Sequence, residues 1–281
     1  MRLRFEDHDR GSAGMTYVYP VVSRRARGVS VGVNLCPNNA CNWRCVYCQV
    51  PGLVYGTAPE IDMARLESEL DRMLDALVNG DYMERHVPEG ARRINDVAFS
   101  GNGESTTSEQ FAEAVEVVAR CLDRVGLQGE TKVVLITNGS MMQKPWTQAG
   151  IERMAAMNGE VWFKLDSAVP ETRARLNGDR TGNDKLARNL RACATRCRTW
   201  LQTIALAWKG EPPSSAEQDA WLAFVGEQLE AGVPLAGVLL YGLARPSHQP
   251  EAPELSQLPA EWLEAYAERM RALGLEVQVS P

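Results

Sequence analysis

The chain has 281 residues, 44% of them hydrophobic, which is enough apolar material to bury the core of one large domain or two small ones. A formal net charge of -6 and a pI near 5.3 exclude a molecule that grips nucleic acid phosphates over its whole surface, although a local basic patch remains open. The N-terminal stretch MRLRFEDHDRGS lacks a signal-peptide core, and the longest apolar run, VPLAGVLLYGLA, is too short to span a bilayer, so we expect a cytoplasmic protein with no membrane partner.

Short β-rich runs alternate with longer amphipathic stretches along the chain. The candidate strands are nearly continuous in apolar residues, as buried parallel strands are: Val29 to Leu35, Ile94 to Ser100, Lys132 to Thr137, Val161 to Asp166, Trp200 to Ala205 and Ala236 to Tyr241. The candidate helices repeat apolar residues at helical spacing: Asp62 to Val78, Ser108 to Val125, Thr147 to Met157, Asn183 to Cys197, Ser215 to Ala231 and Ala260 to Leu273. This alternation predicts an α/β fold with a parallel sheet, a partial (β/α)6 TIM-type barrel in a single domain. A doubly wound open sheet is the other arrangement that fits.

Three segments are expected within this domain. Residues 1–28 form an N-terminal extension or hairpin, residues 29–245 the partial barrel, and residues 246–281 a C-terminal helix and strand that pack on the barrel. The only dense positive run, Arg24, Arg25 and Arg27, suits a solvated hairpin edge, a phosphate contact or a neighbour of a ligand carboxylate. In either fold ligands bind at the carboxyl ends of the strands, so residues that follow each strand are the candidates for chemistry.

Four of the seven cysteines lie in the loop after the first strand, CPNNACNWRCVYC. In a reducing compartment this clustering indicates metal or redox chemistry rather than disulfides. Cys41, Cys45 and Cys48, spaced C-x3-C-x2-C, supply one thiolate fewer than a structural zinc site or a fully ligated cubane, and in a [4Fe-4S] cluster the open iron could bind a small molecule. A zinc site with Cys36 as fourth ligand is the alternative, although its spacing lacks the paired C-x2-C of zinc ribbons. A ferredoxin-like electron carrier would need a fourth cysteine on the cluster.

The stretch CNWRCVYC resembles the cluster motif of the radical S-adenosylmethionine (SAM) superfamily, with Tyr47 in the aromatic position. The flanks YPVVSRRARGVSVGVNL and CQVPG are similar to a branch of iron-sulfur oxidoreductases near the wyosine-base (tRNA) synthases, and the similarity covers roughly residues 17 to 245. The resemblance implies that Cys41, Cys45 and Cys48 bind a [4Fe-4S] cluster whose fourth iron chelates SAM. One electron from a flavodoxin- or ferredoxin-type donor then cleaves SAM to methionine and a 5'-deoxyadenosyl radical, which abstracts hydrogen from a substrate.

The second strand runs into GNGES, which resembles the Gly-Gly-Glu type motif that holds the amino group of SAM in this superfamily, with Ser105 where proline is commoner. As a local pattern it is equally a loop that leads to a helix cap at Thr107 or Ser108. The third strand ends in LITNGS, where the superfamily often places a polar side chain against the ribose or carboxylate of SAM, and where an Asn-Gly turn is the alternative. The residues implied as SAM contacts are Gly101, Asn102, Gly103, Glu104 and Asn138.

The fourth and sixth strands supply charged candidates. Lys164 and Asp166 are two residues apart, so both would face the same side, which in a barrel could be the lumen, where each needs the other or a ligand. By resemblance KLDS belongs to the SAM and substrate pocket, and a match of Lys164 to the Schiff-base lysine of the wyosine branch stays open. Arg245, just past the sixth strand, could clamp a carboxylate or phosphate on the substrate or lie on the surface before a Pro-rich loop.

The substrate is not encoded in a recognisable motif, and several functions stay open. Acidic net charge favours a small-molecule substrate for a radical SAM enzyme, although RNA is a possible substrate because the wyosine neighbours modify tRNA. An activase that abstracts hydrogen from a partner protein's glycine and, more remotely, a zinc-binding module are the alternatives. Cys193 and Cys197 lie one helical turn apart and could ligate a second metal, but buried helical cysteines usually pack as small hydrophobes, and Cys121 is isolated. The three histidines have no ligand spacing.

Overall fold

An eight-stranded sheet forms the centre of the computed structural model, which describes residues 13–23 and 28–281. The arginine run at residues 24–27 lies outside the described residues. The strands lie in the order β1-β2-β5-β6-β7-β8-β10-β12, and every neighbouring pair is parallel except β1 and β2. Their bounds are β1 (Val18–Ser23), β2 (Gly28–Val33), β5 (Ile94–Phe99), β6 (Lys132–Thr137), β7 (Gly159–Lys164), β8 (Arg198–Ile204), β10 (Leu235–Tyr241) and β12 (Val277–Ser280).

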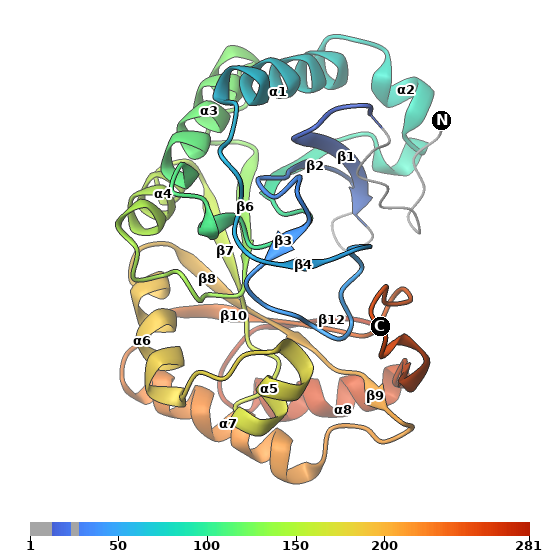
Figure 1. Ribbon diagram of the computed structural model, residues 1–281, viewed down its shortest axis with the longest axis vertical. Helices are drawn as coiled ribbons and strands as arrows, with labels where there is room; N and C mark the ends of the chain where they lie inside the picture. The colour runs from blue at the N-terminus through green and yellow to red at the C-terminus, as the bar shows by residue number, and fades with distance from the viewer. Residues whose placement is uncertain (1–12, 24–27) are drawn as a thin grey trace.

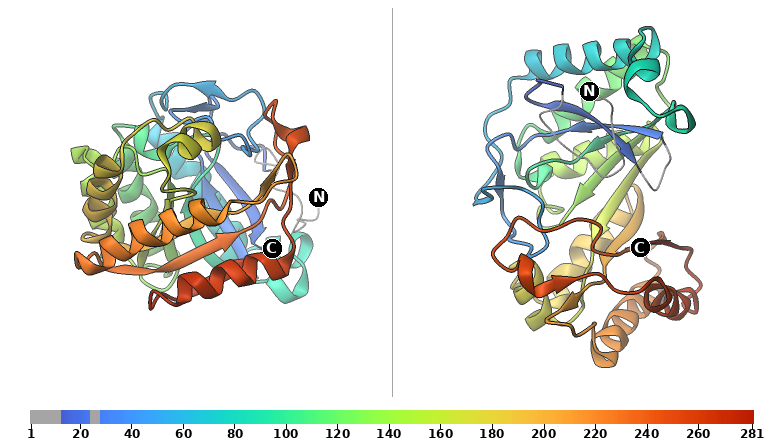
Figure 2. Two further views of the ribbon diagram at one scale, coloured as in Figure 1. Left: turned by 90° about the horizontal axis from the view of Figure 1, so that it is seen from below. Right: turned by 90° about the vertical axis from the view of Figure 1, so that its right-hand side faces the viewer.

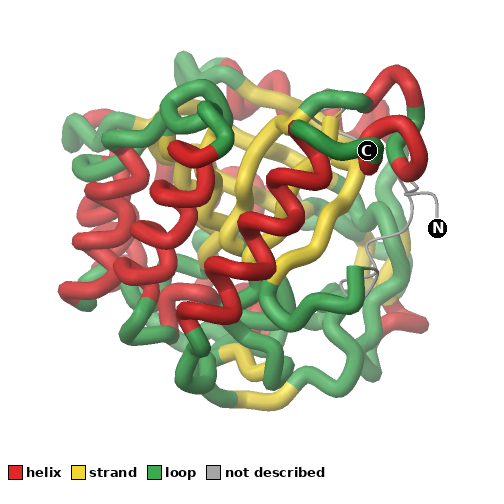
Figure 3. The backbone as a smooth tube through the Cα atoms, turned by 90° about the horizontal axis from the view of Figure 1, so that it is seen from above, coloured by secondary structure: helices red, strands yellow, loops and turns green. Residues whose placement is uncertain are grey.

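The helices cover the convex side of this curved sheet (Figures 1 and 3). Its concave side lines a cavity, called the lumen here. Because the central strands follow one another in chain order, without the reversal that defines a doubly wound sheet, the predicted partial TIM-type barrel is confirmed. Strands β1 and β12 form the two edges and do not pair with each other, so the barrel stays open on one side (Figure 2). The helices are α1 (Met63–Val78), α2 (Tyr82–His86), α3 (Phe111–Arg124), α4 (Pro145–Ala155), α5 (Pro170–Asn177), α6 (Asn183–Ala194), α7 (Ser215–Glu230) and α8 (Ala260–Arg271).

The core between the sheet and its helices follows from the sequence pattern. Helix α1 begins after Asp62, whose side chain accepts a hydrogen bond from Arg65 N, and it turns Leu66, Leu70 and Leu74 inward, all fully buried. Its buried Glu69 accepts hydrogen bonds from the backbone N–H groups of Thr16 and Tyr17, which ties the segment before β1 to the helix. None of the described helices is long and apolar enough to cross a membrane.

The structure corrects the predicted boundaries at two places near the strand ends. Strand β7 ends at Lys164, so Asp166 lies beyond the strand and does not share a face with Lys164 by strand alternation. Helix α3 begins at Phe111 rather than at Ser108, because a short 3-10 turn, η2 (Ser105–Thr107), intervenes. The cap of that turn is Glu104, whose side chain accepts a hydrogen bond from Thr106 N.

A short strand pair and a short helix shape the cysteine loop and were not expected from the sequence. Strand β3 (Ala40–Cys41) pairs in parallel with β4 (Val54–Tyr55), so the loop folds back on itself. Helix α5 follows β7 although its sequence, PETRARLN, has almost no apolar face, and its last residue, Asn177, is buried. The remaining short elements are η1 (Glu89–Ala91), η3 (Ala252–Glu254) and the pair β9 (Ala207–Trp208) and β11 (Leu255–Ser256).

Candidate functional site

Backbone hydrogen bonds hold the cysteine loop at the carboxyl ends of the strands. On one side, Arg44 N donates to Asn177 O at 2.9 Å and Val46 N donates to Leu176 O at 2.8 Å, so the end of α5 fixes both residues that flank Cys45. On the other side, the carbonyl of Cys48 accepts from His248 N at 2.9 Å, which attaches the loop to the segment after β10. Cys45 and Cys48 are therefore fixed by parts of the chain more than a hundred residues away, whereas the carbonyl of Cys41 accepts from Gly56 N nearby in the chain.

The three thiols have environments that suit soft metal ligands. Trp43 N donates to Cys41 Sγ at 3.5 Å, and Asn177 Nδ2 donates to Cys45 Sγ at 3.4 Å. Burial raises the pKa of Cys41 to about 12 and that of Cys45 to about 11, so both thiols stay protonated at neutral pH until a metal displaces the proton. N–H donors to sulfur are the kind of neighbour that tunes iron-sulfur centres.

The loop thiols do not form a compact set of three metal ligands within the described part of the chain. Thiolates around one zinc at Zn–S distances of about 2.3 Å lie only ~4 Å from each other. Among the described residues, no set of three ligand atoms within 4.8 Å of one another includes Cys36, Cys41, Cys45 or Cys48. A cubane binds each cysteine through a different iron and so accepts a wider triangle. The fourth cysteine, Cys36, is 1% exposed, and its thiol donates to Glu104 O at 3.5 Å, which makes it a packing residue beside the site.

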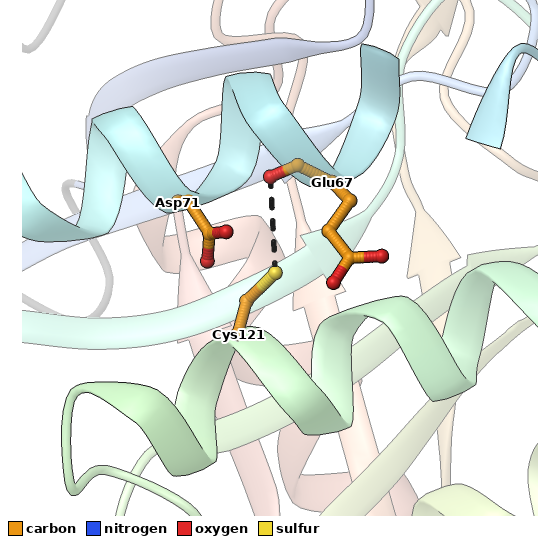
Figure 4. A group of neighbouring side chains, drawn as sticks. All are labelled: Glu67, Asp71 and Cys121. Carbon is orange, nitrogen blue, oxygen red and sulfur yellow. Dashed lines mark hydrogen bonds between the residues drawn. The ribbon is translucent and has the colours of Figure 1, made fainter. Parts of the chain in front are cut away.

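The one compact set of ligand-type side chains in the described part of the chain is Glu67, Asp71 and Cys121, on α1 and α3 (Figure 4). It lies on the outer helices rather than at the strand ends. Arg120 and Arg124 pair with Glu67 at 2.6 and 2.7 Å, and Arg124 also pairs with Asp71 at 2.8 Å. Both carboxylates are therefore neutralised by arginine, and the Cys121 thiol donates to Glu67 O at 3.9 Å. This set is an ion-pair network between two helices.

Glu104 joins the ends of β5 and β6. Its carboxylate is 3% exposed and accepts hydrogen bonds from Thr106 N at 3.2 Å, from Thr137 Oγ1 at 2.8 Å and from Asn138 N at 2.6 Å. Burial raises the pKa of this carboxyl, and the hydrogen bonds oppose that rise. Oxygen Oε1 is crowded by its donors, whereas Oε2 accepts a single hydrogen bond, from Asn138 N.

The two glycines of GNGES bring this turn against the cysteine loop. A Cβ on Gly103 would lie 1.9 Å from Ala40 O, and Gly101 has φ of 141°, a conformation that side-chain-bearing residues rarely adopt. Between them, Asn102 donates from its side chain to Asn39 Oδ1 at 2.7 Å. The glycine requirement at Gly103 therefore comes from close packing on the loop that carries the thiols, and that at Gly101 comes from its φ and from the neighbouring Asn34 side chain.

Asn138 reaches the cysteine loop from the end of β6. Its Nδ2 donates to Asn42 Oδ1 at 2.8 Å, and Asn42 Nδ2 in turn donates to Ser140 Oγ at 2.8 Å. Asn42 lies between Cys41 and Trp43, so the turn after β6 holds the loop at its first ligand. Asn138 Oδ1 also accepts from Ser140 N at 3.0 Å, the local turn contact that the Asn-Gly alternative expected.

Lys164 lies between two aromatic rings at the end of β7. Its Nζ donates to Tyr241 Oη at 2.8 Å and lies 5.1 Å from the ring centroid of Tyr47 and 5.5 Å from that of Tyr241. Burial acts to lower the pKa of Lys164, but the charge of Asp166 and the contacts with Tyr241 outweigh it, so the pKa is raised. Lys164 is thus held as a cation against aromatic faces.

Asp166 does not pair directly with Lys164; no ion pair within 4.0 Å joins these two described residues. Instead Tyr47 Oη and Asn177 Nδ2 both donate to Asp166 Oδ2, the latter at 2.7 Å, and Ile204 N donates to Oδ1 at 3.1 Å. The carboxylate therefore fixes the aromatic residue of the cysteine motif from beyond β7. Asn177, which touches Cys45, Tyr47 and Asp166, is the residue that the sequence did not reveal.

A cavity of about 730 Å³ fills the lumen between β1 and β12 and opens onto the cysteine loop. Six predicted site residues line it, whereas Cys41, Cys45, Asn102, Glu104, Asn138 and Asp166 do not. Arg245 NH1 donates to Gln49 Oε1 at 3.3 Å, one residue past Cys48, so Arg245 is at the mouth of this cavity and not on the outer surface. The lining residues predicted from the sequence are Tyr47, Cys48, Gly101, Gly103, Lys164 and Arg245.

The two helical cysteines of α6 and the turn after it take no part in this site. Cys193 is fully buried with its sulfur 3.3 Å from Thr199 Oγ1, and the Cys197 thiol donates to Gly159 O at 3.3 Å. Burial raises the pKa of both thiols to about 12. They pack as small side chains between α6 and the sheet.

Comparison with known proteins agrees with this arrangement. The profile described as the Radical SAM superfamily matches residues 35–220, which is more than half of the chain, and the chain belongs to that superfamily. Its members are enzymes that in general use a [4Fe-4S] cluster, SAM and a small electron donor. This profile describes the superfamily as a whole, so the predicted placement near the wyosine-base synthases stays a prediction.

Individual relatives are distant. The chain superposes on the crystal structure of a radical SAM methyltransferase from Sphaerobacter thermophilus with a TM-score of 0.60 and 17% identity, covering 90% of this chain and 66% of that chain. A domain of pyruvate-formate lyase-activating enzyme from Bacteroides vulgatus ATCC 8482 gives a TM-score of 0.47 and 13% identity, covering 66% of this chain and 99% of that domain. The GTPase Obg of Brachyspira hyodysenteriae is 25% identical to this chain over 125 residues. The matched segment is 44% of this chain and only 16% of that curated relative's length. The first superposition supports the fold alone.

Proposed function

We propose that the chain is a radical SAM enzyme in which Cys41, Cys45 and Cys48 hold the [4Fe-4S] cluster and the lumen receives a small-molecule substrate. One observation carries this proposal: Tyr47 and Cys48, from the cysteine loop, line the same cavity as Lys164, from β7. Cys41, Cys45 and Cys48 would hold the cluster, which would supply the electron for reductive cleavage of SAM, and SAM would supply the carbon radical for hydrogen abstraction from the substrate.

The thiols of the cysteine loop and their neighbours fit a [4Fe-4S] cluster. Three thiols lie in one loop, two of them accept N–H hydrogen bonds, and the buried Cys36 thiol donates to a backbone carbonyl. Three protein ligands leave one iron open, which is what SAM chelation requires. The aromatic rings of Trp43 and Tyr47, both 8% exposed, cover the loop and exclude water from it.

Each neighbouring residue then has a defined task in binding SAM. Glu104 Oε2, with one hydrogen bond from Asn138 N, keeps an acceptor position for the SAM ammonium, while Gly101 and Gly103 present backbone to the lumen. Lys164 and Arg245 supply positive charge for carboxylates at the mouth of the cavity. Asp166 and Asn138 orient Tyr47 and Asn42, so they act by positioning the loop.

The lumen and the charge of the protein favour a small molecule. The cavity of about 730 Å³ is of the size that encloses metabolite-sized ligands, and a net charge of -6 disfavours RNA. A flavodoxin- or ferredoxin-type protein is the proposed electron donor. A tRNA substrate and a partner protein's glycine are the competing proposals.

Anaerobic reconstitution with iron and sulfide tests the proposal without any knowledge of the substrate. The wild-type chain should bind four irons and four sulfides per molecule, and addition of SAM to the dithionite-reduced protein should change its electron paramagnetic resonance spectrum because SAM occupies the open iron. Cys45→Ala should lose the bound iron, while Cys121→Ala, a matched cysteine outside the loop, should keep it. A wild-type spectrum that SAM leaves unchanged would count against the open iron.

A further inference from the structure

The floor of the lumen carries a buried carboxylate that forms no direct ion pair in the described chain. Asp96, on β5, is 4% exposed and lines the cavity. It accepts hydrogen bonds from the hydroxyl of Ser30 and from Asn95 Nδ2, both uncharged, and no lysine or arginine of the described chain pairs with it within 4.0 Å. Burial raises the pKa of this carboxyl, and the hydrogen bonds from Ser30 and Asn95 and the charge of Lys132, on the neighbouring strand β6, oppose that rise only in part.

The carboxylate of Glu160 on this face is already paired, whereas the two cations at the mouth bond to uncharged groups. Glu160, on β7, forms ion pairs with Lys132 at 2.9 Å and Arg198 at 3.5 Å. The two cations at the mouth, Lys164 and Arg245, hydrogen-bond to Tyr241 and Gln49. Asp96 is thus a lining carboxylate without a direct ion pair in the described chain, and a buried carboxylate favours a cation that comes close to it.

A second observation on another strand also points to a ligand. Gln202, on β8, is 6% exposed and lines the same cavity, and its side-chain amide has no hydrogen-bond partner in the described chain. Its backbone carbonyl accepts a hydrogen bond from Leu165 N, so the backbone has a partner while the side-chain amide has none in the described chain. Because this amide faces the cavity and makes no hydrogen bond to the described protein, it is available to a polar group of a bound molecule.

We propose that the lumen binds a small molecule through a primary ammonium group at Asp96 and a second, uncharged polar group at Gln202. Ser30 holds the Asp96 carboxylate in place, and Gln202 can donate to or accept from a hydroxyl or amide on the same ligand. The amine end lies on the strands and away from the cysteine loop. This inference names the substrate class and rests on the proposed function only in taking the lumen as the substrate chamber.

Calorimetric titration of the anaerobically reconstituted full chain with three matched probes tests this. The probe 6-amino-1-hexanol carries both groups, 1,6-hexanediol replaces the amine by a hydroxyl, and hexylamine lacks the hydroxyl. Because a charge-assisted hydrogen bond contributes more than a neutral one, the amino alcohol should bind about tenfold more tightly than the diol. Equal binding of the amino alcohol and the diol by wild-type protein overturns the proposal, and this comparison needs no variant.

Variants assign the two groups to their partners. Asp96→Asn should bring the amino alcohol and the diol to within about twofold of each other, whereas Asp123→Asn, on the outer surface of α3, should leave the tenfold preference unchanged. Gln202→Leu should remove the advantage of the amino alcohol over hexylamine. An amine preference that persists in a folded Asp96→Asn protein also overturns the assignment.

SAM cleavage, measured on the same preparations, separates this inference from the proposed function. A preparation that cleaves SAM but has no amine preference overturns the inference alone. A preparation that prefers the amine but cannot cleave SAM supports the inference and contradicts the proposed function.

Discussion

The side-chain amide of Asn177 donates hydrogen bonds to Cys45 Sγ at 3.4 Å and to Asp166 Oδ2 at 2.7 Å, so one residue at the end of α5 connects a cluster cysteine to the residue that fixes Tyr47. It is 1% exposed, and its backbone carbonyl accepts from Arg44 N. Asn177 is therefore a positioning residue for the cysteine loop, one that acts through both its backbone and its side chain.

Removing the Asn177 amide should lower the reduction potential of the cluster. A hydrogen bond to a ligating sulfur stabilises the more negative, reduced state, so Asn177→Leu should need a stronger reductant. Asn189→Leu is the matched control, because Asn189 is also buried but donates to Gly139 O, outside the loop. A redox titration followed by paramagnetic resonance makes the measurement; equal potentials in the two variants would show that the Cys45 contact has no electronic effect.

Lys164 should not form a Schiff base with a small carbonyl compound. Condensation needs a neutral amine, and although burial acts to lower the pKa of Lys164, nearby Asp166 and Tyr241 raise it overall, so the ammonium persists through the physiological range. Incubation with pyruvate and cyanoborohydride, followed by peptide mass spectrometry, should leave the Lys164 peptide unmodified. A reduced adduct at Lys164 would place this chain's chemistry closer to that of the wyosine branch.

Gly103→Ala should distort the cysteine loop. The added Cβ would lie 1.9 Å from Ala40 O and 2.9 Å from Cys36 Cβ, so backbone must shift, at a cost of about 1–3 kcal/mol in the free energy of unfolding. Gly90→Ala is the control, since a Cβ there meets nothing within 4 Å. Urea unfolding and iron content measure the two consequences; a Gly103→Ala protein that equals Gly90→Ala in both would contradict the close packing described.

Glu69 should make stability depend on acid pH. Burial acts to raise its pKa, but hydrogen bonds from Thr16 N and Tyr17 N and the Arg65 pair outweigh it, so the pKa lies below its ordinary value of 4.5. A lowered pKa means that the carboxylate stabilises the fold above the unfolded-state pKa and that this contribution is lost as pH falls through the folded-state value. Glu69→Gln should lower the free energy of unfolding by about 1–3 kcal/mol at neutral pH. The difference from wild type should shrink as unfolding is measured at progressively more acid pH, and a constant difference would rule out this linkage.

The sheet was predictable because its central strands are short apolar runs in a fixed alternation with helices, and burial on both faces requires such runs. The end of β7 was misplaced because Leu165 continues the apolar run although the strand stops at Lys164. Helix α5 was missed because its contacts are polar: buried Arg173 pairs with buried Asp179 at 3.2 Å and donates to Asn183 Oδ1. Such a helix is specified by tertiary contacts that no local pattern encodes.

The candidate site was likewise predictable only in part from the sequence. The cysteine spacing is local, so the sequence alone indicated Cys41, Cys45 and Cys48. The contacts of Asn177 with Cys45 and of Asp166 with Tyr47 join residues 132 and 119 positions apart and became visible only in three dimensions. Asp96 carries no motif at all, and its position on the lumen face follows from strand register.

The most direct test of the proposed radical SAM activity measures the products formed from SAM by the anaerobically reconstituted chain with dithionite. We expect equal amounts of methionine and 5'-deoxyadenosine from the wild-type protein and none from Cys45→Ala. Cys193→Ala, which changes a buried cysteine outside the loop, should retain the reaction. Production of both compounds by a folded Cys45→Ala protein, or their absence from a wild-type protein that holds its full iron and sulfide, would contradict it.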